Sequence, residues 1–142
     1  MSTKVTMTWV KGMVFDAVVN GHHILMDADP QWGGQDTGPR PKPLILAAIS
    51  GCTGMDVVSI LEKMHVTGYT FSIDMEAEST TEHPIIYHTI YVKYFFQGND
   101  LPSDKIIKAV KLSSEQYCGV SAMISKSSTM VFKVYINGTE VM

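Results

Sequence analysis

Alternation of apolar and polar positions predicts short strands in the first part of the chain. The stretch from Val5 to Val10 alternates, Lys11-Gly12 interrupts it, and residues 13–19 resume the pattern. Asn20-Gly21 then separates this stretch from residues 23–26, and Asn-Gly suits the positive φ angles of a two-residue type I′ hairpin. We therefore expect an antiparallel meander of three strands.

A long loop is predicted from Asp27 to Pro43. This segment is rich in proline and glycine and carries Trp32 and Arg40, the only arginine of the chain. Loops longer than about 12 residues are usually functional or mobile. Two interpretations remain open: the loop forms a wall of a binding site, or it is a flexible excursion with Trp32 packed against the body of the chain.

A helix is predicted to begin at Lys42 or Pro43 and to end near Met64. Proline suits the first turn of a helix, and Gly68 follows its end. Apolar residues surround the helix axis on nearly all sides, which is typical of a buried helix. One small sheet and one further helix cover only part of its circumference, so we expect a second copy of the chain to cover the rest.

Two long strands should follow this helix. Residues 69–78 alternate strictly between apolar and polar, which is typical of a sheet exposed on one face. Residues 86–96 carry aromatic side chains on both faces. We expect both faces of this second strand to be covered.

A second helix and a last strand complete the pattern. Ser103 or Asp104 suits the N-cap of a helix that continues through Cys118, with this cysteine on the buried side. The last strand is expected at about residues 129–136. The predicted order is β-β-β-α-β-β-α-β, an α+β fold in a single domain of residues 1–142.

Composition and charge limit the number of domains, the partners and the location that we expect of the protein. The 142 residues suit one domain, and 11 Lys and Arg against 14 Asp and Glu give a net charge of -3. Because basic residues are not in excess, we expect no nucleic-acid partner. Residues 1–10 lack the pattern of a secretory signal, which predicts a cytoplasmic protein. Pro43 to Leu61 contains too many small and polar residues for a membrane span, so none is expected.

The chemistry of the chain centres on its two cysteines. The five histidines and the carboxylates show no zinc-like spacing, so we predict no metal site. Cys52 and Cys118 are either inert core residues or redox-active. Thiolate chemistry needs a lowered thiol pKa, and the available cations are Arg40, Lys42 and Lys11. Asp56, one turn after Cys52, would raise that pKa instead.

Three segments resemble the OsmC/Ohr family of organic hydroperoxide reductases. They are Gly38-Pro39-Arg40-Pro41, the segment LILAAISGCT that contains Cys52, and the segment EQYCGVS that contains Cys118. The resemblance extends over essentially the whole chain. It implies an intertwined homodimer around buried central helices, with two sites at the subunit interface and no cofactor. It also implies that Cys52 is the peroxidatic cysteine and Cys118 the resolving one.

The chain departs from the peroxidases of this family at two points. Lys42 and Pro43 stand where those proteins carry glutamates, and no arginine precedes Arg40. The partner of the Cys52 thiolate must therefore be sought among Lys11, Lys42 and Arg40. The resemblance is greatest to the OsmC-like branch of the family.

These observations give a leading hypothesis and an alternative. The leading hypothesis is a thiol peroxidase that reduces a small organic hydroperoxide and is restored by a dithiol, such as a lipoylated protein. Trp32, Met55 and Tyr117 are the candidate apolar walls of its pocket, and Cys52 should lie next to Cys118. The alternative is a non-catalytic OsmC-like dimer that binds a small apolar ligand or senses redox state.

Overall fold

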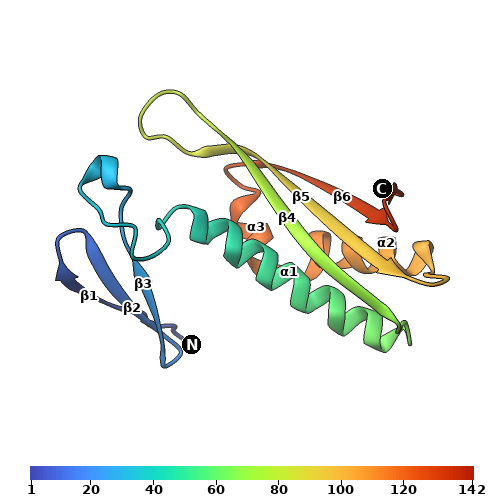
Figure 1. Ribbon diagram of the computed structural model, residues 1–142. Helices are drawn as coiled ribbons and strands as arrows, with labels where there is room; N and C mark the ends of the chain where they lie inside the picture. The colour runs from blue at the N-terminus through green and yellow to red at the C-terminus, as the bar shows by residue number, and fades with distance from the viewer. The chain divides into compact units, whose positions relative to one another are not determined.

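The computed structural model describes residues 1–142 and divides into two compact units, residues 1–47 and 48–142. It contains two sheets and three α-helices, which confirms the predicted α+β class and element order (Figure 1). The strands are β1 (Thr6–Lys11), β2 (Val14–Val19), β3 (His22–Met26), β4 (Tyr69–Ser79), β5 (Tyr87–Gly98), β6 (Thr129–Ile136) and β7 (Thr139–Glu140). The helices are α1 (Pro43–Lys63), α2 (Ser103–Leu112) and α3 (Gly119–Ile124), with a 3-10 turn at Pro30–Trp32 and a π-helical turn at Ser113–Tyr117.

The first unit is built on the predicted meander. Strands β1, β2 and β3 pair antiparallel in that order. Asn20 and Gly21 have φ angles of 50° and 80°, which confirms the type I′ turn between β2 and β3. The short turn fixes the pairing of Val19 with His22 and therefore the register of the hairpin.

Asp27 organises the long loop that follows β3. This side chain is buried, and its carboxylate accepts hydrogen bonds from the backbone N–H groups of Ala28 (2.7 Å), Gln35 (3.1 Å) and Thr37 (3.1 Å). The Thr37 hydroxyl donates a fourth, at 2.7 Å. These donors, the Thr37 hydroxyl foremost, lower the pKa of Asp27 to about 2. The loop is therefore anchored within the first unit, and Trp32 is 71% exposed. Both interpretations of Trp32, as a wall of a binding site or as packed against the body of the chain, stay predictions.

Two glycines allow this loop to return against β3. A Cβ atom on Gly34 would lie 1.8 Å from the Ala28 carbonyl oxygen, and one on Gly38 would lie 2.5 Å from the Leu25 carbonyl oxygen. Both positions therefore exclude any larger residue without movement of the backbone. The backbone N–H of Asp27 completes the closure by donating to the Pro39 carbonyl at 3.2 Å.

The second unit is a four-stranded sheet with helices packed on it. Strands β4 and β5 form a long antiparallel hairpin, β5 and β6 are parallel, and β7 pairs with β6. A parallel pair needs a crossover connection, which α2, the π-helical turn and α3 supply (Figure 1). The buried side chains of β5 all lie on one face, and they are Ile90, Val92, Tyr94 and Phe96. The opposite face is only partly covered, so the expectation that both faces of β5 are covered is wrong within one chain.

Helix α1 has the bounds that the sequence predicts, but it is not buried on nearly all sides within one chain. Within one chain only the i, i+4 stripe of Ile49, Thr53, Val57 and Leu61 is buried. Gly54 lies over β4, since a Cβ atom there would be 3.4 Å from the Ile73 side chain. Met55 and Val58, on other sides of the helix, are exposed. The single chain therefore leaves much of this apolar helix uncovered.

Helix α1 is also long and apolar enough to cross a membrane by length and composition alone. Its 21 residues reach a mean hydropathy of 1.9 over an 18-residue window. Core helices of soluble proteins meet the same criteria, and the buried stripe of α1 packs on the sheet of its own unit. The absence of a membrane span stays a prediction.

The region predicted as one helix through Cys118 consists of three segments. Helix α2 ends at Leu112, and its N-cap is Pro102, so the expectation of Ser103 or Asp104 at that position is wrong. A π-helical turn follows, closed by the Cys118 N–H on the Ser113 carbonyl at 2.8 Å. Cys118 then adopts an extended backbone with φ −74° and ψ 100° and becomes the N-cap of α3. Its side chain is buried, as predicted, although it does not lie on a continuous helix.

Candidate functional site

Two cysteines and one aspartate meet in the second unit. Cys52 and Asp56 lie one turn apart on α1, and Cys118 caps α3. The two sulfur atoms and the nearest Asp56 carboxylate oxygen all lie within 4.8 Å of one another. This confirms the prediction that Cys52 and Cys118 are neighbours. Cys118 is 3% exposed, whereas Cys52 is partly exposed, so Cys52 is the more accessible thiol.

The first turn of α3 supplies hydrogen-bond donors to both sulfurs. The Cys118 sulfur accepts from the Ser121 backbone N–H at 3.4 Å and from the Ser121 hydroxyl at 3.1 Å. Burial raises the pKa of the Cys52 thiol, and the neighbouring Cys118 and Asp56 raise it further. The Val120 backbone N–H acts in the opposite direction by stabilising the Cys52 thiolate.

A chain of buried hydroxyl groups ends at Asp56. The Ser113 hydroxyl donates to the Asp56 carboxylate at 3.0 Å, so its oxygen is an acceptor toward Thr53, 2.8 Å away. The Thr53 hydroxyl therefore donates its one proton to the Ser113 oxygen. It accepts a hydrogen bond from the Tyr94 hydroxyl at 2.6 Å. Burial raises the pKa of Tyr94 to about 12, which keeps this donor protonated. All three protons point toward the carboxylate and hold it in one orientation.

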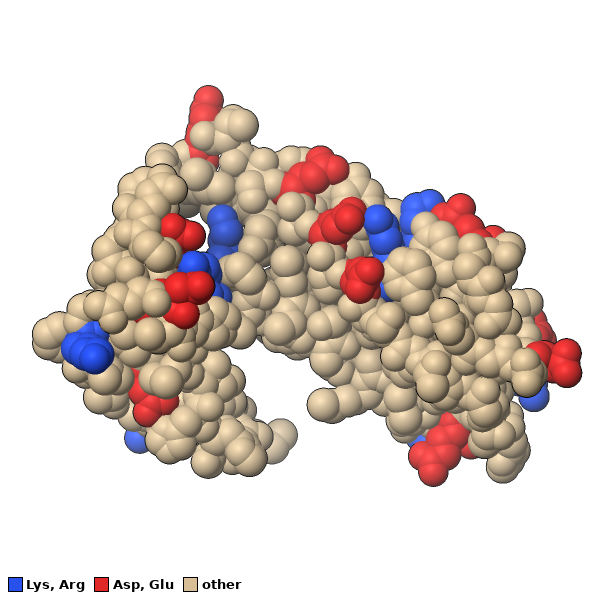
Figure 2. Space-filling model, viewed as in Figure 1, with Lys and Arg blue, Asp and Glu red and all other residues tan.

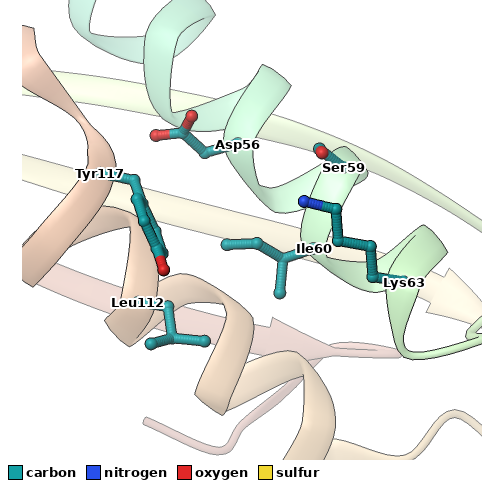
Figure 3. A pocket seen from close by; sticks show the side chains of 6 residues that line it. All are labelled: Asp56, Ser59, Ile60, Lys63, Leu112 and Tyr117. Carbon is teal, nitrogen blue, oxygen red and sulfur yellow. The ribbon is translucent and has the colours of Figure 1, made fainter.

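A pocket of about 410 Å³ opens beside Asp56. Figure 3 shows α1 on one side of it and the helical segment that carries Leu112 and Tyr117 on the other. Ile60 and Leu112 give it apolar walls, while Asp56 and Lys63 give it one charge of each sign. The pocket suits a small molecule with both apolar and polar parts.

The three predicted wall residues lie in three different places. Tyr117 lines the pocket beside Asp56. Met55 lines a separate groove of about 470 Å³ along α1, with Gly51, Gly54 and Phe71 among its other walls. Trp32 belongs to the first unit. Within the second unit, therefore, Tyr117 alone of the three faces the same pocket as Asp56.

The three predicted thiolate partners, Arg40, Lys42 and Lys11, belong to the first unit. Arg40 forms ion pairs with Asp36 at 2.5 Å and Asp29 at 3.4 Å, and the Asp36 carboxylate raises the pKa of the guanidinium. Lys11 lines a small pocket of that unit. A contact of any of these cations with Cys52 stays a prediction.

Charged side chains of both signs are interspersed on the face shown in Figure 2. Several charged side chains of the chain form local pairs, including Lys93 with Glu76 at 3.0 Å and Lys133 with Glu140 at 2.7 Å. Such exposed pairs contribute little to stability. The absence of a nucleic-acid partner stays a prediction.

Sequence reasoning missed the polar residues that surround the cysteines. Thr53, Tyr94 and Ser113 stand among apolar positions of a helix, a strand and a turn, and they come together only in the folded unit. One signal was available in the sequence, since Thr53 shares the i, i+4 stripe of Ile49 and Val57 and is a polar residue in a buried row. Ser121, three residues after Cys118, also has the spacing of a capping residue.

Comparisons with known proteins show the family and the fold of this chain. A family described as OsmC-like protein matches residues 34–133. Protein YhfA of Escherichia coli K12 is 34% identical over 120 residues, which cover 84% of this chain and 87% of that protein. A hypothetical protein of Aquifex aeolicus shares the fold at a TM-score of 0.85 and 27% identity, with 96% and 97% of the two chains covered. The organic hydroperoxide resistance protein OhrB of Bacillus subtilis has a TM-score of 0.64 at 16% identity, over 95% and 98% of the chains.

The fold and the adjacent cysteines define a protein of the OsmC/Ohr class, which includes hydroperoxide resistance proteins. The chain belongs to the OsmC-like protein family.

Proposed function

We propose that this protein is a cysteine-based thiol peroxidase that reduces small organic hydroperoxides. The observation that carries the proposal is the pair of sulfur atoms within 4.8 Å, one partly exposed and one buried. Such a pair suits a nucleophile that meets the substrate and a second thiol that resolves the product. The exposure difference supports Cys52 as the peroxidatic residue and Cys118 as the resolving residue.

The proposed cycle has three steps. The Cys52 thiolate attacks the distal oxygen of the hydroperoxide, the O–O bond breaks, and the alkoxide takes a proton and leaves as the alcohol. The Cys52 sulfenic acid then condenses with the Cys118 thiol to a disulfide and water. A dithiol reductant, such as a lipoylated protein, reduces this disulfide and becomes a disulfide itself.

The surroundings of Cys52 predict slow turnover and a rising pH dependence. A raised thiol pKa leaves only a small fraction of thiolate at neutral pH, and this fraction grows as the pH rises toward the pKa. We expect alkylation of Cys52 by iodoacetamide to keep accelerating through pH 9. If the alkylation rate instead reaches a plateau below pH 8, a cation lowers the pKa of the Cys52 thiol in the assembled protein. The candidates are Arg40, Lys42 and Lys11.

The proposal includes a homodimer in the cytoplasm. The uncovered groove along α1 contains Gly51, Gly54, Met55 and Val58, and the first unit exposes apolar side chains such as Trp9. Surfaces of this kind mark protein interfaces, and members of the OsmC/Ohr family are known as dimers. Sedimentation of a monomer at micromolar concentration would contradict this assembly.

The decisive experiment measures consumption of tert-butyl hydroperoxide with dihydrolipoamide as reductant. We expect Cys52→Ser to abolish turnover and Cys118→Ser to consume one equivalent and then stop at the sulfenic acid. Ser125→Ala, at the end of α3, is the control and should keep the full rate. The peroxidase proposal fails if the unmodified protein is no faster than an equal concentration of free cysteine.

A second function is favoured by one observation. The first unit contains an almost wholly apolar pocket of about 280 Å³, lined by Met7, Met13, Phe15 and Met26 among others. A small apolar ligand would fit such a pocket. Failure of the peroxidase assay together with binding of an apolar probe there would support a non-catalytic, ligand-binding dimer.

A further inference from the structure

We propose that Cys52, Asp56 and Cys118 bind a divalent, thiol-seeking metal ion of the Zn²⁺ type when both cysteines are reduced. This inference does not rest on the peroxidase proposal. It gives the same sulfurs a second role and departs from the prediction of no metal site. That prediction rested on spacing along the chain, and only the fold brings Cys118 next to Cys52 and Asp56.

The distances suit such a site. Zinc binds thiolate sulfur at about 2.3 Å and carboxylate oxygen at about 2.0–2.2 Å in tetrahedral geometry, so neighbouring ligand atoms lie roughly 3.5–4 Å apart. The three candidate atoms lie within 4.8 Å of one another, so each would have to move by about 1 Å or less to reach these distances. A water molecule would occupy the fourth position, as in other zinc sites with three protein ligands.

The backbone presents the ligands from two rigid elements. Cys52 and Asp56 are four residues apart on α1, so their side chains lie on the same side of the helix. Cys118 is fixed by its position as the N-cap of α3 and by two donors from Ser121. Two thiolates and a carboxylate carry three negative charges, of which a dication compensates two.

The hydroxyl chain serves as the outer shell of this site. Metal-ligating carboxylates are commonly held by further hydrogen bonds, and loss of such a partner costs about 10–100-fold in metal affinity. Ser113 donates to Asp56 and is itself held by Thr53, which Tyr94 holds in turn. The carboxylate therefore has a fixed orientation before any ion arrives.

Metal binding and oxidation should exclude one another. Binding of Zn²⁺ replaces the two thiol protons, which are released to solvent, and no electron is transferred. A Cys52–Cys118 disulfide leaves no thiolate for the ion. An occupied site likewise has no free sulfur for a peroxide, so the metal would protect the reduced pair from oxidation.

The test is a titration of the reduced, full-length protein with Co²⁺ under nitrogen, without peroxide. We expect one equivalent per chain to give a sulfur-to-cobalt charge-transfer band and intense tetrahedral d–d bands, both removed by Zn²⁺. Cys52→Ser and Cys118→Ser should each abolish the tetrahedral spectrum. Asp56→Asn should weaken Zn²⁺ binding at least tenfold, whereas Glu62→Gln, the same charge change on the same helix, should leave it unchanged.

Two further measurements make the outcome independent of folding defects in the variants. Unmodified protein oxidised to the disulfide should bind no Co²⁺, and Ser113→Ala should retain the tetrahedral spectrum with Zn²⁺ affinity reduced about 10–100-fold. The proposal is overturned if reduced protein gives no tetrahedral spectrum, or if Asp56→Asn binds as tightly as the parent. Peroxide reduction measured with a chelator present tests the proposed function separately, so either can fail alone.

Discussion

Asp27 and Asp56 are two partly or wholly buried aspartates with opposite surroundings. The side chain of Asp27 is buried, and its carboxylate accepts hydrogen bonds from Ala28, Gln35 and Thr37. The carboxylate of Asp56 accepts one bond, from Ser113, and otherwise faces two sulfur atoms.

This difference separates a carboxylate that holds a loop together from one that keeps acceptor capacity next to two thiols. Four hydrogen bonds, one to Oδ1 and three to Oδ2, hold the loop around Asp27 and use most of the acceptor capacity of its carboxylate. Asp56 keeps acceptor capacity free next to two thiols, so it remains available for a proton or a metal ion. The number of donors around a buried carboxylate is therefore a better guide to its role than its burial alone.

The largest effect expected from this comparison is that of Asp27→Asn on stability. An amide NH₂ group cannot accept from N–H donors, so the Asn side chain must lose either the Ala28 bond or the Gln35 and Thr37 bonds, and the bonds that remain lose the negative charge of their acceptor, which should loosen the loop. We expect a thermal midpoint lower by several degrees and faster proteolysis within residues 27–43. Asp29→Asn is the matched control, because this exposed side chain accepts one bond from the Gln31 N–H and forms a 3.4 Å surface ion pair with Arg40, and its replacement should change the midpoint little.

Acid should reduce the contribution of the Asp27 carboxylate to stability without any mutation. The pKa of Asp27 is about 2 in the folded chain against an ordinary value of 3.8, so the unfolded chain takes up the proton at the higher pH. The stabilisation is complete above about pH 4 and is lost as the pH falls through about 2. Urea unfolding of the parent and of Asp27→Asn should show a stability difference that shrinks over this window. A difference that is constant with pH would show that the ionised carboxylate is not the cause.

Ser113→Ala should have a smaller effect on stability. The change removes the acceptor of the buried Thr53 hydroxyl proton and the hydrogen-bond donor to the Asp56 carboxylate, which costs about 1–3 kcal/mol, although Thr53 keeps its bond to Tyr94. Ser114→Ala, the exposed neighbour whose hydroxyl bonds to the Lys111 carbonyl, is the control and should cost far less. Equal losses for the two variants, measured by denaturant unfolding, would contradict a buried hydroxyl chain.

Tyr94→Phe should have the smallest effect. It removes the first donor of the chain and keeps the ring in the core, at a cost of about 0.5–1.5 kcal/mol. Tyr91→Phe, on the exposed face of the same strand with its hydroxyl on Glu78, should be nearly neutral. If the Tyr94→Phe protein is as stable as the Tyr91→Phe protein, the Tyr94 hydroxyl does not contribute to the hydrogen-bond chain. Ser113 and Thr53 alone would then orient the Asp56 carboxylate.

Local patterns in the sequence predicted the elements, and long-range pairing decided the rest. The bounds of α1, the Asn20-Gly21 turn and the strand order depend on neighbouring residues, and each is confirmed. The break at Cys118 was missed because Ile106, Ile107 and Val110 continue a helical spacing, while the π-helical turn depends on the Cys118 N–H reaching Ser113. The anchoring role of Asp27 was missed because its partners lie up to ten residues away in a loop without periodicity.

The candidate site was predictable only through its cysteines. The segments around Cys52 and Cys118 carry the family resemblance, and the two sulfurs do meet. Asp56 was visible as a residue one turn from Cys52, but its hydroxyl partners come from β5 and from the turn after α2. No spacing along the chain relates these elements, since only the packing of α1 on the sheet brings them together.

The π-helical turn at Ser113–Tyr117 makes this part of the chain intolerant of any change in length. A π turn is an α-helix with one additional residue, and one residue corresponds to about 100° of rotation around a helix axis. Deletion of Ser114 would restore α-helical winding and turn Cys118 away from Cys52, although every side chain of the pair would still be present. In descendants of this gene, substitutions within the turn should therefore accumulate, whereas single-codon deletions there should be removed by selection whenever the meeting of the two sulfurs is required.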